Sequence, residues 1–228
     1  MGSAGEIFTE SVLMKIKDPG SAITHFIGFA AAFISGPFLI RHYLERGAES
    51  LEVFSAVVFM VSMMLLYAAS TLYHTVKTCG NHGLVLKKLD HLMIFVLIAG
   101  TYTPICLTVL KDKGGIYLLL LVWGFAIAGM IFKLFWVTCP KWLSSVIYVS
   151  MGWLCVLRFP TLLECLDIRG FLFLLLGGIV YTAGGIIYAL KFKRLNDISP
   201  YFGSHEIFHL FVLLGNALQF VTVYNYLI

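Results

Sequence analysis

Seven long apolar stretches divide this chain, and they constrain its fold more than any other feature of the sequence. Each stretch is long enough to cross a bilayer as an α-helix, which needs about 20 residues. Only 12% of the residues are charged and 60% are hydrophobic, whereas about 25% of residues are charged in an average soluble domain. We therefore predict an all-α integral membrane protein with seven transmembrane helices. They are expected at residues 21–41, 52–75, 89–110, 115–136, 142–160, 170–190 and 203–227.

The connections between these stretches are short, which predicts one bundle over residues 21–228 after a cytoplasmic segment of residues 1–20. The orientation follows from the positive-inside rule, by which Lys and Arg favour the cytoplasmic side. One side holds ten such residues and the other holds six. The ten are Lys15, Lys17, Lys77, Lys87, Lys88, Lys133, Lys141, Lys191, Lys193 and Arg194, and the six are Arg41, Arg46, Lys111, Lys113, Arg158 and Arg169. We expect a cytoplasmic N-terminus and an external C-terminus.

The net charge of +4 is modest, and its basic residues lie mostly between apolar stretches. They are typical of topology signals and headgroup contacts, so the expected partners are membrane lipids and no nucleic acid. The expected location is a cell membrane, which the chain crosses several times.

Ionisable residues at the ends of three predicted helices point to a functional site. His74 ends the second apolar stretch, Asp90 opens the third, and His205 and His209 open the seventh. Successive helices cross in alternate directions, so all four side chains lie on one side of the membrane, whichever way the bundle is oriented. In the orientation predicted above, that side is the cytoplasmic leaflet. Ionisable groups are costly within a membrane and are functional candidates there.

The spacing of these residues favours a metal site. His205 and His209 are four positions apart, so both imidazoles project from one helix face about 6 Å apart along the axis. Ser70 and His74 have the same spacing, which adds a hydroxyl to the face that carries the third histidine. Three imidazoles and a water give the open coordination of a catalytic zinc. We predict His74, His205 and His209 as zinc ligands, with Asp90 and Ser70 as catalytic groups.

Two other interpretations of these residues stay open. The segment Ser204–Val212, SHEIFHLFV, contains the His-Glu-x-x-His spacing of a zinc metalloprotease helix, in which Glu206 would be the base and Asp90 the third ligand. That interpretation leaves His74 without a role. Alternatively, Asp90 only caps its helix and Ser70 only bonds its own backbone.

The remaining histidines have simpler interpretations. His42, His82 and His91 are typical of residues at the membrane interface, whereas His25 lies on the same side as the predicted site and is a candidate to support it.

The order of these residues resembles the hemolysin III family. The family pattern is Ser-x-x-x-His in the second helix, Asp at the start of the third and His-x-x-x-His in the seventh. Other segments agree with it as well, and the resemblance covers nearly the whole chain. They are Ala69–His74 (ASTLYH), Leu89–His91 (LDH), Ala99–Pro104 (AGTYTP) and Met151–Leu154 (MGWL).

This resemblance links the chain to the progestin and adipoQ receptors, which include the adiponectin receptors, and to the alkaline ceramidases. It implies a bacterial seven-helix protein with zinc near the cytoplasmic leaflet. By position, it makes His74, His205 and His209 the ligands, Asp90 the contact of the water at the zinc, and Ser70 a neighbour. The histidine pair of this family does not require an intervening Glu, so the resemblance makes Glu206 incidental.

The activity that follows is metal-dependent hydrolysis of a lipid amide or ester, in membrane lipid homeostasis. A ceramide-like or other acylated lipid is the substrate that the resemblance suggests. Two non-enzymatic functions remain as alternatives: a cytolytic pore, as the family name records, or a sensor of membrane state in which zinc is structural.

Overall fold

The computed structural model describes residues 16–78, 80–190 and 203–228, and every regular element in these ranges is helical. The all-α prediction is confirmed for this part of the chain. The elements are α2 (Pro19–Glu45), α3 (Ser50–Thr75), α4 (Asn81–Leu107), α5 (Gly115–Phe135), α6 (Lys141–Gly152), the 3₁₀-helix η1 (Trp153–Arg158), α7 (Phe159–Cys165), α8 (Ile168–Leu190) and α10 (Ser204–Tyr226).

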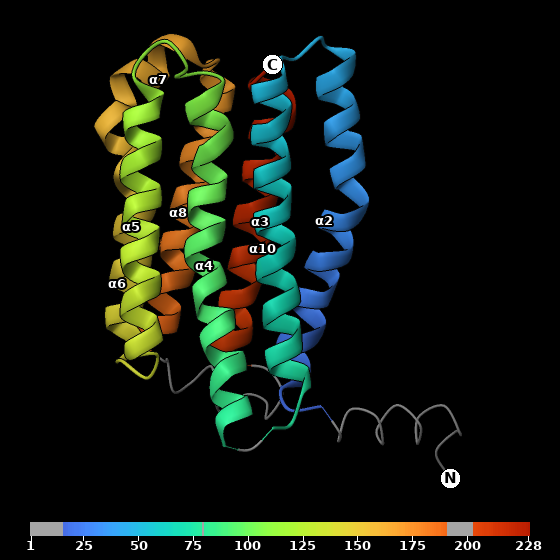
Figure 1. Cartoon of the computed structure of the whole chain (residues 1–228), viewed down its shortest axis with the longest axis vertical. Coiled ribbons are helices and arrows are strands. Elements are labelled where there is room, and N and C mark those ends of the chain that lie inside the picture. Colours follow the sequence, from blue (N-terminus) through green and yellow to red (C-terminus); the bar gives the residue numbers. More distant parts are fainter. Residues whose placement is uncertain (1–15, 79, 191–202) are drawn as a thin grey trace.

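The long helices run side by side along the length of the molecule (Figure 1). Helix α3 packs between α2 and α4, and α10 packs on α8 and α2. The end of α3 and the beginnings of α4 and α10 lie at the same end of the bundle, the lower end in Figure 1. These three helix ends therefore lie together, as the predicted alternation in helix direction requires.

Six helical stretches are long and apolar enough to cross a membrane, counted over the residues described. They match six of the seven predicted spans, with α6, η1 and α7 together forming one of them. Helix α4 is not among the six, although it is 27 residues long and lies within the bundle. It begins at Asn81, well before the predicted residue 89, and its first turns carry Lys87 and Lys88. Large apolar side chains such as Phe33, Phe125 and Leu172 are exposed on the outside of the bundle, as a lipid environment requires.

The fifth predicted span, residues 142–160, is not one continuous α-helix. Helix α6 ends at Gly152, and a 3₁₀ segment leads into α7. Tyr102 of α4 supports this break, because its hydroxyl donates to the Gly152 carbonyl at 2.5 Å and accepts from the Cys155 N–H at 2.9 Å. A side chain from another helix thus satisfies backbone groups that a regular helix would pair internally. Pro160, near the start of α7, is also compatible with a new helix beginning there.

Small residues let α8 approach its neighbours closely. A Cβ at Gly184 would lie 2.7 Å from Cβ of Phe211 on α10, and a Cβ at Gly177 would collide with Nε2 of Gln219. Gly178, by contrast, has no atom near its missing Cβ and faces a cavity instead. Close packing of α8 therefore depends on Gly177 and Gly184, while Gly178 contributes to the cavity wall.

One of the basic residues on which the predicted orientation depends, Lys133, does not lie in an exposed loop. Lys133 was counted among the loop charges, but it is fully buried at the end of α5, where its Nζ donates to Ser144 Oγ at 2.6 Å and contacts Cys139 Sγ at 3.0 Å. Four of the other charges, Lys15, Lys191, Lys193 and Arg194, lie outside the described residues. The direction in which the bundle crosses the membrane stays a prediction.

Candidate metal centre

Three histidines from two helices meet at the lower end of the bundle. His74 lies in the last turn of α3, and His205 and His209 lie in the first two turns of α10. One ring nitrogen from each residue lies within 4.8 Å of the others. The Nε2 atoms of His74 and His205 are 3.2 Å apart. The structure thus brings together the three residues that were predicted as ligands.

The spacing of these nitrogens fits a single metal ion. Zinc binds imidazole nitrogen at about 2.0–2.1 Å, so two nitrogens on one tetrahedral ion lie roughly 3.3 Å apart. The 3.2 Å between His74 and His205 agrees with that value. Three protein ligands also leave one position open, which distinguishes catalytic from structural zinc. Imidazoles suit several transition metals, and the cluster has the composition and spacing to hold one such ion.

Asp18, immediately before α2, orients the ring of His74. The His74 Nδ1–H donates to Asp18 Oδ2 at 2.9 Å, since a carboxylate can only accept. The other ring nitrogen, Nε2, is thereby left without a proton in the neutral imidazole and faces His205. A carboxylate behind a metal-binding histidine is a recurrent way of fixing its tautomer. The same hydrogen bond from His74 is the main reason that the pKa of Asp18 is lowered from its ordinary value.

Two more residues of α2 contact His209. The Thr24 Oγ1 atom lies 3.4 Å from His209 Nδ1, and its own hydroxyl proton has backbone carbonyls nearby to which it can donate. The ring of His25 stacks on that of His209, with centroids 3.7 Å apart. His25 is buried, and neither of its ring nitrogens has a hydrogen-bond partner among the residues described. It therefore supports the cluster by ring packing.

Glu206, the acid of the His-Glu-x-x-His spacing, is directed to α2 and to the start of its own helix. Its Oε1 accepts from the Ser21 hydroxyl at 2.6 Å, and its Oε2 accepts from the Gly203 N–H at 2.8 Å. A Glu in the third helical position commonly reaches back to the first free backbone N–H in this way. The carboxylate that would act as base in a zincin is thus engaged in holding the start of α10.

Asp90 and Ser70 line a cavity that His205 and His209 also line, but they do not belong to the three-histidine group. Asp90 is 8% exposed, and its Oδ2 lies 3.4 Å from His91 Nδ1. The Ser70 hydroxyl is buried. Both side chains are therefore placed beside the predicted ligands, where they could contact a molecule bound in the cavity.

The three histidines expected at the membrane interface lie outside the cluster. His91 Nδ1 bonds the Lys87 carbonyl at 2.9 Å, although the residue also borders the cavity. His42 stacks on Tyr224 near the opposite end of the bundle. His82 is exposed in the first turn of α4.

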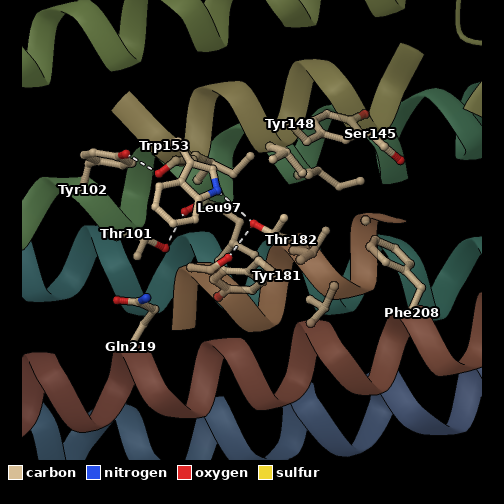
Figure 2. Close-up of a pocket in the computed structure, with 18 of the residues that line it drawn as sticks. Leu97, Thr101, Tyr102, Ser145, Tyr148, Trp153, Tyr181, Thr182, Phe208 and Gln219 are labelled. Atoms are coloured by element: carbon tan, nitrogen blue, oxygen red, sulfur yellow. Dashed lines mark hydrogen bonds between the residues drawn. The ribbon is translucent and has the colours of Figure 1, made fainter. Parts of the chain in front are cut away.

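A cavity of about 150 Å³ extends into the bundle from His205 and His209, the two histidines of the cluster that line it. Figure 2 shows Ser145 and Phe208 toward one end, and Thr101, Tyr102 and Gln219 toward the other. Between these ends the wall is mainly aliphatic and aromatic, with a hydrogen bond from Trp153 Nε1 to Thr182 Oγ1 at 2.9 Å. Two residues that contact the cluster, Asp18 just before α2 and Thr24 within it, are not predicted from the sequence. Asp18 precedes the first apolar stretch, and no local pattern marks a partner 56 positions away.

Comparison with known proteins agrees with this arrangement. Residues 14–220 match the family model described as Haemolysin-III related. The chain is 40% identical over 210 residues to the "Hemolysin-3 homolog" of Bacillus subtilis (strain 168), covering 92% of this chain and 94% of the relative. It is also 40% identical over 215 residues to "Hemolysin-3" of Bacillus cereus, covering 93% and 92%.

A more distant similarity reaches the animal receptors. The chain is 24% identical over 248 residues to the "Adiponectin receptor protein" of Drosophila melanogaster, covering 90% of this chain and 49% of that protein. The resemblance inferred from Ser70, His74, Asp90 and the histidine pair of α10 is therefore confirmed. With the family model matching most of its length, this multi-pass membrane protein belongs to the haemolysin-III related family.

Proposed function

We propose that this protein is a zinc-dependent hydrolase that cleaves an amide or ester bond in a membrane lipid. The observation that carries the proposal is that two residues of the three-histidine cluster, His205 and His209, line one end of an elongated, mainly apolar cavity. A metal at that end would meet the head of a lipid, while the cavity would hold its acyl chain. We place the reaction in a bacterial plasma membrane, with membrane lipids as the partners.

The length of the cavity supports an acyl chain as its occupant. Both His209 and Gln219 line it, and they are ten residues apart on α10. At 1.5 Å per residue this separation is about 15 Å. The wall between them includes Leu97, Ile98 and Val212, which suit hydrocarbon better than a polar substrate.

The histidines of the cluster and two residues of the cavity wall, Asp90 and Ser70, would have different roles in the reaction. His74, His205 and His209 would hold zinc, which supplies a Lewis acid and lowers the pKa of a water that it binds. Asp90 accepts the proton of the attacking water and later returns it to the leaving amine or alcohol. The hydroxyl of Ser70 donates to the oxygen that becomes negatively charged as the carbonyl is attacked.

Metal content is the first test. Protein purified in detergent without chelators is expected to carry about one zinc per chain, matching the three-ligand site. The double variant His205→Ala/His209→Ala is expected to carry none. A metal-free wild-type protein would overturn the proposal at its first step.

The second test separates catalysis from metal binding. Asp90→Asn is expected to keep its zinc and to lose roughly 10²- to 10⁴-fold in hydrolytic rate, the usual contribution of a general base. Asp167→Asn, an acid at the start of α8, is the matched control and should retain full rate. The assay is release of fatty acid from a panel of lipid amides and esters in mixed micelles. Full activity in a zinc-loaded Asp90→Asn protein would remove the base from the mechanism.

The names of two relatives favour a second, non-enzymatic candidate, a cytolytic pore. In that case purified protein should release dye from liposomes in proportion to its amount, and the His205→Ala/His209→Ala variant should do so equally well. A pore needs a polar stripe along a whole helix, whereas the wall of the cavity here is mainly apolar. A membrane-state sensor, the third candidate, would bind zinc without turnover.

A further inference from the structure

The far end of the cavity carries a hydrogen-bond acceptor that the proposed chemistry does not use. Gln219 lies on α10 and is only 4% exposed. Its Oε1 is buried and has no hydrogen-bond partner among the residues described. Figure 2 shows the amide on the side of Thr101 and Tyr102, away from Phe208. A buried amide oxygen without a partner loses its hydrogen bonds to water and gains nothing in return.

The orientation of this amide is fixed by its nitrogen. Nε2 donates to the Leu174 carbonyl of α8 at 3.1 Å. Turning the amide over would place Oε1 against that carbonyl, and two acceptors cannot bond each other. The absence of a side chain at Gly177 leaves room for the amide, because a Cβ there would collide with Nε2. Oε1 is therefore held as a buried acceptor on a residue that lines the cavity.

The neighbouring polar groups do not satisfy Oε1, because their protons are used elsewhere. The Thr101 hydroxyl donates to the Leu97 carbonyl at 2.8 Å, and the Tyr102 hydroxyl donates to the Gly152 carbonyl. A donor for Gln219 therefore has to arrive with whatever fills the cavity.

We propose that Gln219 recognises a hydroxyl group on an acyl chain bound in the cavity. The inference rests on the proposed function for the position of the lipid head at the histidines. The ten residues from His209 to Gln219 correspond to about 15 Å along α10. An extended chain of C–C bonds of about 1.5 Å advances a little less than one bond length per carbon, so this distance is roughly twelve carbons. The preferred ligand is therefore an acyl chain hydroxylated near its twelfth carbon, whose O–H donates to Gln219 Oε1.

The test is competitive binding to the full-length protein in detergent. A fluorescent fatty acid is displaced by octadecanoic acid, by 12-hydroxyoctadecanoic acid and by 2-hydroxyoctadecanoic acid. The 12-hydroxy acid is expected to bind roughly five- to tenfold more tightly than the unsubstituted acid, as one buried hydrogen bond contributes. The 2-hydroxy acid, whose hydroxyl stays beside the head, should gain nothing from Gln219.

A substitution at Gln219 tests whether this residue causes the preference for the 12-hydroxy acid. Gln219→Met keeps the length of the side chain and removes the amide, so the ratio of the two affinities should fall to about one. Asn225→Leu is the matched control. The Asn225 side chain, like that of Gln219, is an amide on α10 that donates to a backbone carbonyl, but it is exposed and lies outside the cavity. This substitution should leave the ratio unchanged.

The outcomes separate this inference from the proposed function. Equal affinities for the 12-hydroxy and unsubstituted acids would overturn the role of Gln219 and leave acyl-chain binding in place, as would a preference that survives in Gln219→Met. If no fatty acid displaces the probe, both the inference and the lipid cavity are wrong. Should Gln219→Met fail to fold, the comparison of hydroxyl positions on the wild-type protein still decides.

Discussion

Removing the carboxylate of Asp18 should weaken metal binding although Asp18 is not a ligand. Its hydrogen bond to His74 Nδ1, at 2.9 Å, fixes the tautomer that presents Nε2 to the metal. Loss of such a partner typically lowers metal affinity 10- to 100-fold. The Asp18 side chain is 41% exposed, so water already screens part of the interaction and the lower end applies. We expect Asp18→Ala to raise the Kd for zinc about tenfold, or about 1.4 kcal/mol.

A graded variant sharpens this expectation. Asp18→Asn keeps a hydrogen-bond acceptor and loses the charge, and charge-assisted hydrogen bonds are about twice as strong as neutral ones. Half of the free energy should remain, so the Kd should rise roughly threefold. The Kd for zinc is thus predicted to increase from wild type to Asp18→Asn and again to Asp18→Ala.

Zinc affinity is measured by competition with a chromophoric chelator on detergent-purified protein. Asp167→Ala is the control, since Asp167 also precedes a helix and its Oδ1 accepts the Arg169 N–H at 2.8 Å. That helix, α8, begins at the opposite end of the bundle, next to α7 (Figure 1). Unchanged affinity in Asp18→Ala, or an equal loss in Asp167→Ala, would refute the argument that Asp18 orients His74.

Two further predictions concern the packing that positions the cavity. Gly184→Ala should lower the unfolding free energy by about 1–3 kcal/mol, because the new methyl group meets α10. Gly178→Ala, where nothing lies within 4 Å of the added atom, should not, and a comparison of melting temperatures by tryptophan fluorescence checks both variants. Tyr102→Phe should cost about 1–3 kcal/mol in the same assay, since the Cys155 N–H and the Gly152 carbonyl both lose a partner. A melting temperature equal to that of wild type would contradict the role of Tyr102 in the helix break.

The three-histidine cluster could be predicted from sequence because two regular features of the fold bring its residues together. Consecutive membrane helices alternate in direction, so the end of α3 meets the start of α10, and a spacing of four puts His205 and His209 on one face. Neither argument requires knowledge of a loop or of a side-chain contact. The three histidines were therefore predictable as a group.

Other features depend on contacts between distant segments and were not predictable. The end of α6 at Gly152 depends on the hydroxyl of Tyr102, which lies 50 positions earlier. Burial of Lys133 depends on Ser144 and Cys139 across the turn between α5 and α6, while its place near a span end suggested an exposed charge. Periodicity and composition contain no information on such pairs.

The beginning of α2 contacts both of the helices that carry the clustered histidines, α3 and α10. Asp18 bonds His74 on α3, and Ser21 bonds Glu206 on α10, three positions apart and thus on one face of the helix start. Thr24 and His25, one turn further along, contact His209. The two sides of the metal centre are therefore joined through α2 as well as through any bound ion.

This arrangement also gives the His-Glu-x-x-His spacing a structural origin. The histidines need a spacing of four to share one face. Glu206 stands between them because the third helical position is where an acid can reach the Gly203 N–H, and from there it reaches Ser21. The spacing of the histidines and the position of the acid thus have separate causes, and together they give the sequence pattern of a protease helix. In this protein, however, the Glu206 carboxylate is directed away from the cavity. The base of the proposed reaction is then the carboxylate on the other wall, Asp90, which a pattern search confined to α10 would miss.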